Sequence, residues 1–189
     1  AAFAERMNAE ARRLGMNSTR FVNAHGLHSD QQFTNARDLA ILAMALRNEF
    51  PQYAHYFTLE AISAGNKVME NHNDLIMRFD GATGMKTGYT CPSGFNLIAS
   101  ATRGGRNLLA VVIGEPTVEA RADKAANMLA AGFAQPGDAA PYLGQLRPRG
   151  NEPVAPQNLR PVICTEAHWK AVTEARGPEG HPAYSSPHL

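Results

Sequence analysis

The sequence lacks an excess of charge of either sign and contains few cysteines. Its 189 residues include 18 lysines and arginines against 17 acidic residues, a formal net charge of +1. Because binding to nucleic-acid phosphates needs a clustered basic excess, nucleic acid is excluded as the main partner. Two cysteines, Cys91 and Cys164, are too few for a four-cysteine zinc site or a dense disulfide scaffold. No apolar run approaches the roughly 20 residues that a transmembrane helix needs.

The residues that are present describe a globular protein with an unevenly distributed proline content. Hydrophobic residues make up 44% of the chain, enough to build a core, and its length corresponds to about one domain. Three of the 12 prolines precede residue 134, and the other nine lie between Pro136 and Pro187. We therefore predict a folded domain over residues 1–133 and a loosely structured, proline-rich tail or linker over 134–189.

Periodicity and turn residues predict the secondary structure of the first part. Helices are expected over 1–14, over 34–48 with Thr34 as the N-cap, and over 118–131. Residues 95–101 and 108–114 are expected to form two strands joined by a turn at 103–107. A short helix is expected over 164–172. Since the helices and strands are segregated, the pattern predicts an α+β fold with antiparallel strands and a helix packed across them.

The segment with the clearest chemical signature is Gly84-Met85-Lys86-Thr87-Gly88-Tyr89-Thr90. A lone Lys-Thr-Gly triplet is more often a glycine-rich turn with a solvated lysine than a site. The same triplet also forms the strand beside the active serine in penicillin-binding proteins and class A β-lactamases. Its surroundings favour the second interpretation, because order, spacing and residue types also match in segments 21–27, 34–40, 71–76 and 93–101. Residues 1–133 resemble the serine D-alanyl-D-alanine carboxypeptidases, the low-molecular-mass penicillin-binding proteins.

The resemblance implies a fold, a reaction and a location. The fold would be of the β-lactamase/DD-peptidase type, an antiparallel sheet with helices on both faces. The reaction would be cleavage of the D-Ala–D-Ala bond of the peptidoglycan stem peptide by a serine, through an acyl-enzyme that β-lactam antibiotics trap. It implies no cofactor and no metal. The protein is expected to be periplasmic or exported, in the cell envelope.

The Lys-Thr-Gly strand carries the catalytic roles that the resemblance implies. Lys86 places a positive charge beside a substrate that ends in a carboxylate, and it can assist proton transfer. The hydroxyl of Thr87 can bind that carboxylate. Gly88 has no side chain, so the substrate can lie against the strand edge as an added strand. The backbone N–H of Tyr89 is expected to donate to the oxyanion of the tetrahedral intermediate.

Three further residues are expected to contribute to substrate binding. Thr90 lies at the end of the same strand. Arg121 matches a family arginine that helps to hold the terminal carboxylate, although a surface arginine paired with an acidic neighbour is an equally good interpretation. His72 stands where relatives carry an arginine, which predicts a weaker, pH-dependent positive group. Thr83 stands where an aspartate is common.

The two motifs that would complete the catalytic machinery are missing from the sequence. No serine is followed by lysine three residues later or by asparagine two residues later, and Ser63 comes nearest, with Asn66 and Lys67. In the family both motifs lie upstream of the region that resembles Ala1, and the chain begins inside a periodic helix. We therefore expect the C-terminal part of a catalytic domain, inactive alone, whose partner would be an N-terminal fragment carrying Ser-x-x-Lys.

Two other functional interpretations and several lesser sites remain open. The chain could be a non-catalytic module that binds wall peptides or another protein, or a truncated product that does not fold. His25, His28 and Asp30 superficially resemble a metal-binding set, but a structural loop is favoured there. Cys91 is expected to be an inert, partly buried thiol. Trp169 is expected to anchor the tail helix on an apolar surface.

Overall fold

A computed structural model describes residues 2–137, 143 and 155–189 of the chain. The described elements are the helices α1 (Ala2–Arg13), α2 (Ala36–Glu49), α3 (Val118–Ala134), α4 (Arg160–Ile163) and α5 (Glu166–Arg176), the 3-10 helix η1 (Pro51–Thr58), and the strands β1 (Ala61–Ala64), β2 (Lys67–Glu70), β3 (Ala82–Thr90), β4 (Gly94–Arg103) and β5 (Arg106–Glu115). No helix within these ranges is long and apolar enough to span a bilayer.

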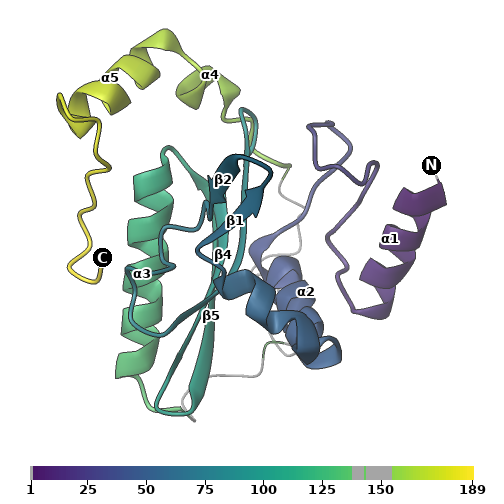
Figure 1. The fold of residues 1–189 in the computed structure, drawn as a ribbon. Coiled ribbons are helices and arrows are strands. Elements are labelled where there is room, and N and C mark those ends of the chain that lie inside the picture. Colours follow the sequence, from purple (N-terminus) through teal and green to yellow (C-terminus); the bar gives the residue numbers. More distant parts are fainter. Residues whose placement is uncertain (1, 138–142, 144–154) are drawn as a thin grey trace.

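The centre of the molecule is an antiparallel sheet of three strands in the order β3-β4-β5. Helix α3 covers one face of this sheet and α2 lies on the other (Figure 1). The α+β prediction, with helices on both faces of an antiparallel sheet, is confirmed. Alternate side chains of β4 and β5 pack against small residues of α3, so the helix lies close to the sheet. This core consists mainly of Leu97, Ala99, Ala101, Ala110, Val112, Ala122, Ala125, Ala126 and Leu129.

The predicted helices and strands are present, with small shifts at their ends. Helix α2 begins one residue later than predicted, because the N-cap is Asn35, whose side chain accepts a hydrogen bond from the Asp38 N–H at 2.8 Å. Thr34 instead contacts the hydroxyl of Thr19. The β4–β5 turn is tighter than predicted. Gly104 and Gly105 have φ angles of 55° and 76°, a conformation that glycine adopts without strain.

A polar contact joins α2 to the sheet beside the candidate motif. Arg47 of α2 donates to the hydroxyls of Ser100 and Thr83 at 2.9 and 3.2 Å, and those two hydroxyls are 2.9 Å apart. Thr83 lies where the β3–β4 register shifts, between the pairs of Ala82 and Gly84. Thr83 therefore helps to attach α2 to the start of β3.

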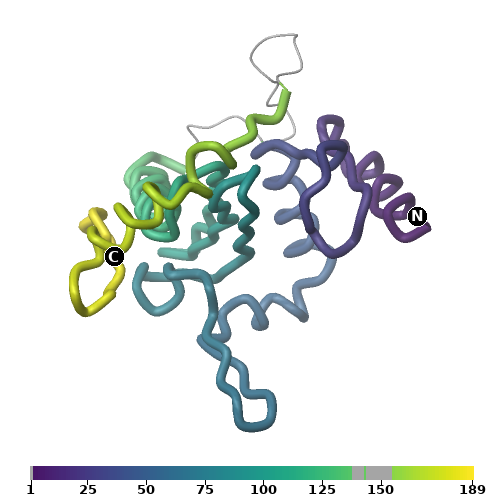
Figure 2. The backbone as a smooth tube through the Cα atoms, turned by 90° about the horizontal axis from the view of Figure 1, so that it is seen from above, coloured from purple at the N-terminus to yellow at the C-terminus, as the bar shows by residue number. Residues whose placement is uncertain are grey.

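Strands β1 and β2 form a separate hairpin that projects from the body of the molecule (Figure 2). All eight of its strand residues are exposed. The hairpin therefore contributes little to the core that positions β3.

Residues 155–189, here called the strap, cross the end of the sheet and then run along α3 (Figure 1). The short helix predicted over 164–172 is confirmed as α5. Where composition predicted only a loose tail, the described part of this segment packs on the domain: Ile163 is buried, and the Trp169 and Phe95 rings form a T-shaped pair with 6.3 Å between their centroids. The boundary at residue 133 stays a prediction.

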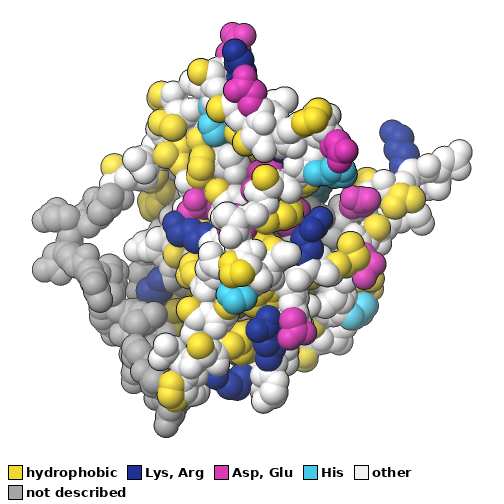
Figure 3. Space-filling model, turned by 90° about the vertical axis from the view of Figure 1, so that its left-hand side faces the viewer, with side chains coloured by type: hydrophobic (Ala, Val, Ile, Leu, Met, Phe, Trp, Pro, Cys, Tyr) yellow, Lys and Arg dark blue, Asp and Glu magenta, His cyan; other side chains and the backbone are white. Residues whose placement is uncertain are grey.

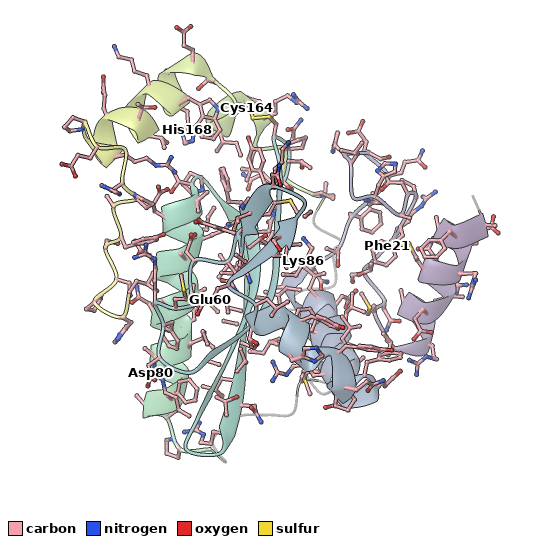
Figure 4. All side chains as sticks on the ribbon, in the orientation of Figure 1. Phe21, Glu60, Asp80, Lys86, Cys164 and His168 are labelled. Atoms are coloured by element: carbon pink, nitrogen blue, oxygen red, sulfur yellow. A yellow bond between two sulfur atoms is a disulfide. The ribbon has the colours of Figure 1, made fainter. Side chains whose placement is uncertain are left out.

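The prediction that Cys91 is a free thiol is wrong, because Cys91 forms a disulfide with Cys164. The two Cα atoms are 5.7 Å apart although the residues are 73 positions apart in sequence. The strap brings Cys164 to the turn that follows β3 (Figure 4). The disulfide therefore fastens the strap to the end of the candidate motif.

This disulfide predicts a large dependence of stability on the redox state. Closing a loop of this length lowers the entropy of the unfolded chain and stabilises the fold by about 4 kcal/mol in the chain-entropy account. Replacing Cys91 and Cys164 by serine should lower the free energy of unfolding by up to that amount, measured by denaturant titration. As a matched control, dithiothreitol should lower the value for the wild-type chain but leave the double-serine variant unchanged. Equal stability of the two chains without reductant would contradict this account.

Candidate functional site

Strand β3 holds the Lys-Thr-Gly motif at the edge of the main sheet within the described residues. The register pairs Lys86 with Ile98 and Thr87 with Leu97. Because Leu97 belongs to the core under α3, strand alternation directs Thr87 to the α3 side and Lys86 to the opposite side. Figure 4 shows Lys86 on the side of the sheet away from α3. The outer edge of β3 presents unpaired backbone groups, which is the usual template for binding an extended peptide.

The two glycines of β3 lack a side chain for different structural reasons. At Gly84, φ is 133° and a Cβ atom would come within 2.6 Å of the Phe57 Cβ, so close contact with η1 excludes a side chain. At Gly88, a Cβ atom would meet no atom within 4 Å, and its φ is not in the positive range. No described contact requires glycine at position 88. The missing side chain instead leaves space beside the strand.

The Lys86 and Thr87 side chains form few polar contacts with the rest of the domain. Lys86 is exposed, its Nζ donates to the carbonyl oxygen of Thr87, and no carboxylate within the described ranges forms an ion pair with it. No hydrogen-bond partner for the Thr87 hydroxyl occurs in the part of the chain that the structure describes. An ammonium group and a hydroxyl are thus both available at the strand edge, a combination suited to a carboxylate.

The end of β3 makes more contacts with its surroundings than the Lys86 and Thr87 side chains do. The Tyr89 ring stacks on Phe95 with 4.2 Å between centroids, and its hydroxyl lies 3.1 Å from the Cys164 Sγ. The Thr90 hydroxyl donates to the Ser93 Oγ at 2.9 Å. Of the two predicted threonines, Thr90 therefore stabilises the turn after β3, whereas Thr87 is available for a ligand.

Arg121 and His72 are in contact, but through the His72 backbone. The Arg121 guanidinium donates to the His72 carbonyl at 2.7 Å and lies 5.8 Å from the centre of the Phe95 ring. Only 4% of Arg121 is exposed, so it is not a surface arginine. Burial lowers the pKa of Arg121, and the negative charge of Asp74 opposes this shift. The His72 side chain is exposed. Arg121 therefore fixes the loop that carries His72.

The carboxyl group of Asp74 and the phenol of Tyr184 complete this cluster. Burial raises the pKa of Asp74, and the charge of Arg121 opposes the shift. Burial, followed by the charge of Asp74, raises the pKa of Tyr184 to about 12. The Arg78 guanidinium lies 4.9 Å from the Tyr184 ring centre. Tyr184 belongs to the strap, so the end of the chain contributes to the surroundings of Arg121.

The lesser site candidates have structural roles. The Asn23 side chain accepts from the Gly26 N–H and donates to the Leu27 carbonyl at 2.9 Å each, which supports the structural interpretation of this loop. His25 accepts from the Leu27 N–H, and His28 contacts Asp30 at 3.0 Å. No group of three or more potential metal ligands occurs among the described residues.

Sequence reasoning missed Cys164, Asp74 and Tyr184 as neighbours of the site. One signal was present: two cysteines in a protein expected to be exported often form a disulfide. No comparable pattern pointed to Asp74 or Tyr184, which are distant in sequence from Arg121.

Comparison with known proteins assigns the chain to a family. Residues 1–117 match the family model of the S11 peptidases, described as D-alanyl-D-alanine carboxypeptidase. The chain therefore belongs to the D-alanyl-D-alanine carboxypeptidase family, a serine peptidase family.

Individual relatives agree with this assignment. The chain is 36% identical over 128 residues to the D-alanyl-D-alanine carboxypeptidase DacD of Escherichia coli K12, which is 67% of this chain and 33% of that protein. It is 39% identical to DacC of the same organism over 130 residues, covering 67% of this chain and 32% of that protein. The chain thus spans about a third of the length of these curated relatives.

Solved structures give the same result. Penicillin-binding protein D2 of Listeria monocytogenes, in its ampicillin-bound form, has a TM-score of 0.65 and 31% identity over 69% of this chain and 55% of that one. Penicillin-binding protein 5 of Haemophilus influenzae has a TM-score of 0.67 and 32% identity over 70% of this chain and 39% of that one. The predicted family and fold are confirmed.

The cluster around Asp74 predicts how the strap responds to alkaline pH. The pKa of Tyr184 is raised from 10.0 to about 12, so folding favours the neutral phenol. Its contribution to stability is complete below about pH 10 and is lost as the pH rises through about 12. A phenolate absorbance titration should show a component near pH 12 that disappears in Tyr184→Phe. The exposed Tyr56→Phe serves as control and should keep that component. A Tyr184 component centred near pH 10 would contradict the described burial.

Proposed function

We propose that this chain supplies the substrate-binding strand of a serine D-Ala-D-Ala carboxypeptidase that acts in peptidoglycan maturation. The observation that carries the proposal is the edge strand β3. Among the described residues, the Lys86 ammonium forms no ion pair and the Thr87 hydroxyl no hydrogen bond, and Gly88 leaves open space beside the strand. A stem peptide ending in D-Ala-D-Ala would add to this edge in an extended conformation. Family membership supports the same reaction class.

Each residue of the strand has a role in the proposed reaction. Lys86 and Thr87 leave opposite faces of β3, but the Lys86 Nζ lies at the Thr87 carbonyl, so the ammonium and the Thr87 hydroxyl together bind the terminal carboxylate of the substrate, and Lys86 assists proton transfer. The backbone N–H of Tyr89 donates to the oxyanion of the tetrahedral intermediate. Losing one such donor typically costs about 2.7–4 kcal/mol of barrier. No metal or cofactor takes part in this proposal.

The remaining predicted residues act at a greater distance from the substrate. Arg121 orients the backbone at His72 through its hydrogen bond to the carbonyl oxygen. The exposed His72 side chain is available to the substrate carboxylate when protonated. Thr90 keeps the end of β3 in place through Ser93.

The nucleophile belongs to a segment outside these 189 residues. No serine in the chain is followed by lysine at the third position, so the acyl-enzyme requires a Ser-x-x-Lys segment from elsewhere in the protein or from a partner fragment. The same serine would react with β-lactam antibiotics. This is in line with the ampicillin-bound and cefotaxime-bound forms of the Listeria relative.

We propose a periplasmic or exported location in the cell envelope. Disulfides persist mainly in oxidising compartments, and the Cys91–Cys164 bond supports such a location. Peptidoglycan, the proposed substrate, is also extracytoplasmic.

The absence of a nucleophile motif also favours a second candidate, a module that binds wall peptides without chemistry. Both candidates require an acyl-D-Ala-D-Ala peptide to bind at Lys86 and Thr87. They differ in whether an upstream segment with Ser-x-x-Lys belongs to the same protein, which sequencing the DNA upstream of Ala1 answers.

The proposal predicts which forms of the protein react with penicillin. Fluorescent penicillin should label a protein that contains both this chain and a Ser-x-x-Lys segment, but not the chain alone. Lys86→Ala in the extended protein should lower the acylation rate by roughly a hundredfold, because a charged partner and a proton carrier are both lost. Lys67→Ala, at an exposed lysine of β2, is the matched control and should acylate normally.

Two results would contradict this account of the site. Covalent labelling of the chain alone would show that the nucleophile lies within it. Unchanged labelling of the Lys86→Ala protein would show that Lys86 plays no part in acylation.

A further inference from the structure

The strap is attached along its length to the parts of the domain that surround the end of β3. At its start, the Leu159 N–H donates to the Pro92 carbonyl at 2.9 Å. The Leu159 side chain lies close to Gly94, where an added Cβ would come within 2.9 Å of its Cδ1 atom. Ile163 is 1% exposed. The first part of the strap is therefore packed against the β3–β4 turn.

The second set of contacts reaches the aromatic side chains of the motif strand. Cys164 forms the disulfide with Cys91, and both sulfur atoms lie near the Tyr89 hydroxyl, at 3.1 and 3.7 Å. Trp169 of α5 packs edge-on against Phe95, and Phe95 in turn stacks on Tyr89. Within the strap, Cys164 therefore contacts Tyr89 directly, and Trp169 supports it through Phe95.

The third set of contacts fixes the strap to α3. Figure 4 shows His168 on the side of α5 toward the domain, and its Nε2 lies 3.1 Å from the Pro116 carbonyl. Arg176 forms an ion pair of 2.6 Å with the nearly buried Glu119. The buried Asp123 accepts hydrogen bonds from Ser185 and Ser186. Figure 3 shows this side of the molecule, where acidic, basic and apolar side chains are intermixed.

We infer that the strap is a positioning element for β3, in which Cys164 and Trp169 act through Tyr89 to fix the backbone N–H that faces the reacting carbonyl. The inference rests on the proposed function for the role of that N–H. An oxyanion donor is effective only when it is held at its place before the reaction. Tyr89 is the last but one residue of an edge strand, where the backbone otherwise has the freedom of a strand end. The disulfide and the ring contacts remove that freedom.

The geometry separates this role from general stabilisation of the fold. The core under α3 is formed mainly by β4, β5 and α3. The strap adds Tyr184 and Leu189 against it, but neither Cys164 nor Trp169 belongs to it. Loss of the strap contacts at Tyr89 should therefore loosen the end of β3 first and leave the middle of β5 protected.

Hydrogen exchange on the 189-residue chain tests this directly. In Trp169→Ala, the amides of Gly88 and Thr90 should exchange about tenfold faster, while those of Ala110–Val112 change less than about twofold. Trp169→Phe should largely restore protection because an aromatic ring remains. Lys170→Ala, at the exposed next residue of α5, is the matched control. Exchange that is unchanged, or that rises equally in β3 and β5, would overturn the inference.

A second measurement connects the strap to the reaction. In the protein extended to include Ser-x-x-Lys, Trp169→Ala should slow acylation by penicillin about tenfold or more and leave the dissociation constant of the initial complex unchanged, since the oxyanion donor acts in the transition state. An unchanged acylation rate alongside faster local exchange would overturn the positioning role. If the extended wild-type protein is not labelled at all, the proposed function fails. The hydrogen-exchange result then still decides whether the strap holds β3.

Discussion

The antiparallel pairing of β3 with β4 is the constraint on which the site depends. It places Lys86 and Thr87 on opposite faces of an edge strand and leaves the outer backbone groups of that strand unpaired. The pairing is rigid because β4 lies between two strands and packs its alternate side chains on α3. A binding edge next to a central, buried strand combines a fixed position with accessibility.

The two ends of β3 are held by different chemistry. At the start, hydroxyl groups of Thr83 and Ser100 meet Arg47 of α2. At the other end, aromatic contacts and a disulfide hold Tyr89. Between them lie Lys86, whose ammonium donates to the Thr87 carbonyl, and Thr87, whose hydroxyl has no hydrogen-bond partner among the described residues. This distribution agrees with a strand whose middle is reserved for a ligand.

The motif and the alternating patterns made much of this arrangement predictable from sequence. Lys86 and Thr87 belong to a short motif with a known mechanism, and the apolar runs of β4 and β5 define a sheet with one buried face. Two features were not predicted, because each depends on residues brought together only by folding. The Cys91–Cys164 bond requires the strap to fold back. The burial of Arg121 requires the packing of Asp74 and Tyr184 around it.

The outer edge of β3 is the proposed binding site of a D-Ala-D-Ala terminus, and amide NMR of the ¹⁵N-labelled 189-residue chain tests this binding most directly. Titration with an acyl-D-Ala-D-Ala peptide should shift the amide signals of Lys86–Thr90 in a saturable way. An acyl-L-Ala-L-Ala peptide should have a much smaller effect. Saturable shifts confined to other parts of the chain, or equal shifts with both peptides, would contradict the claim.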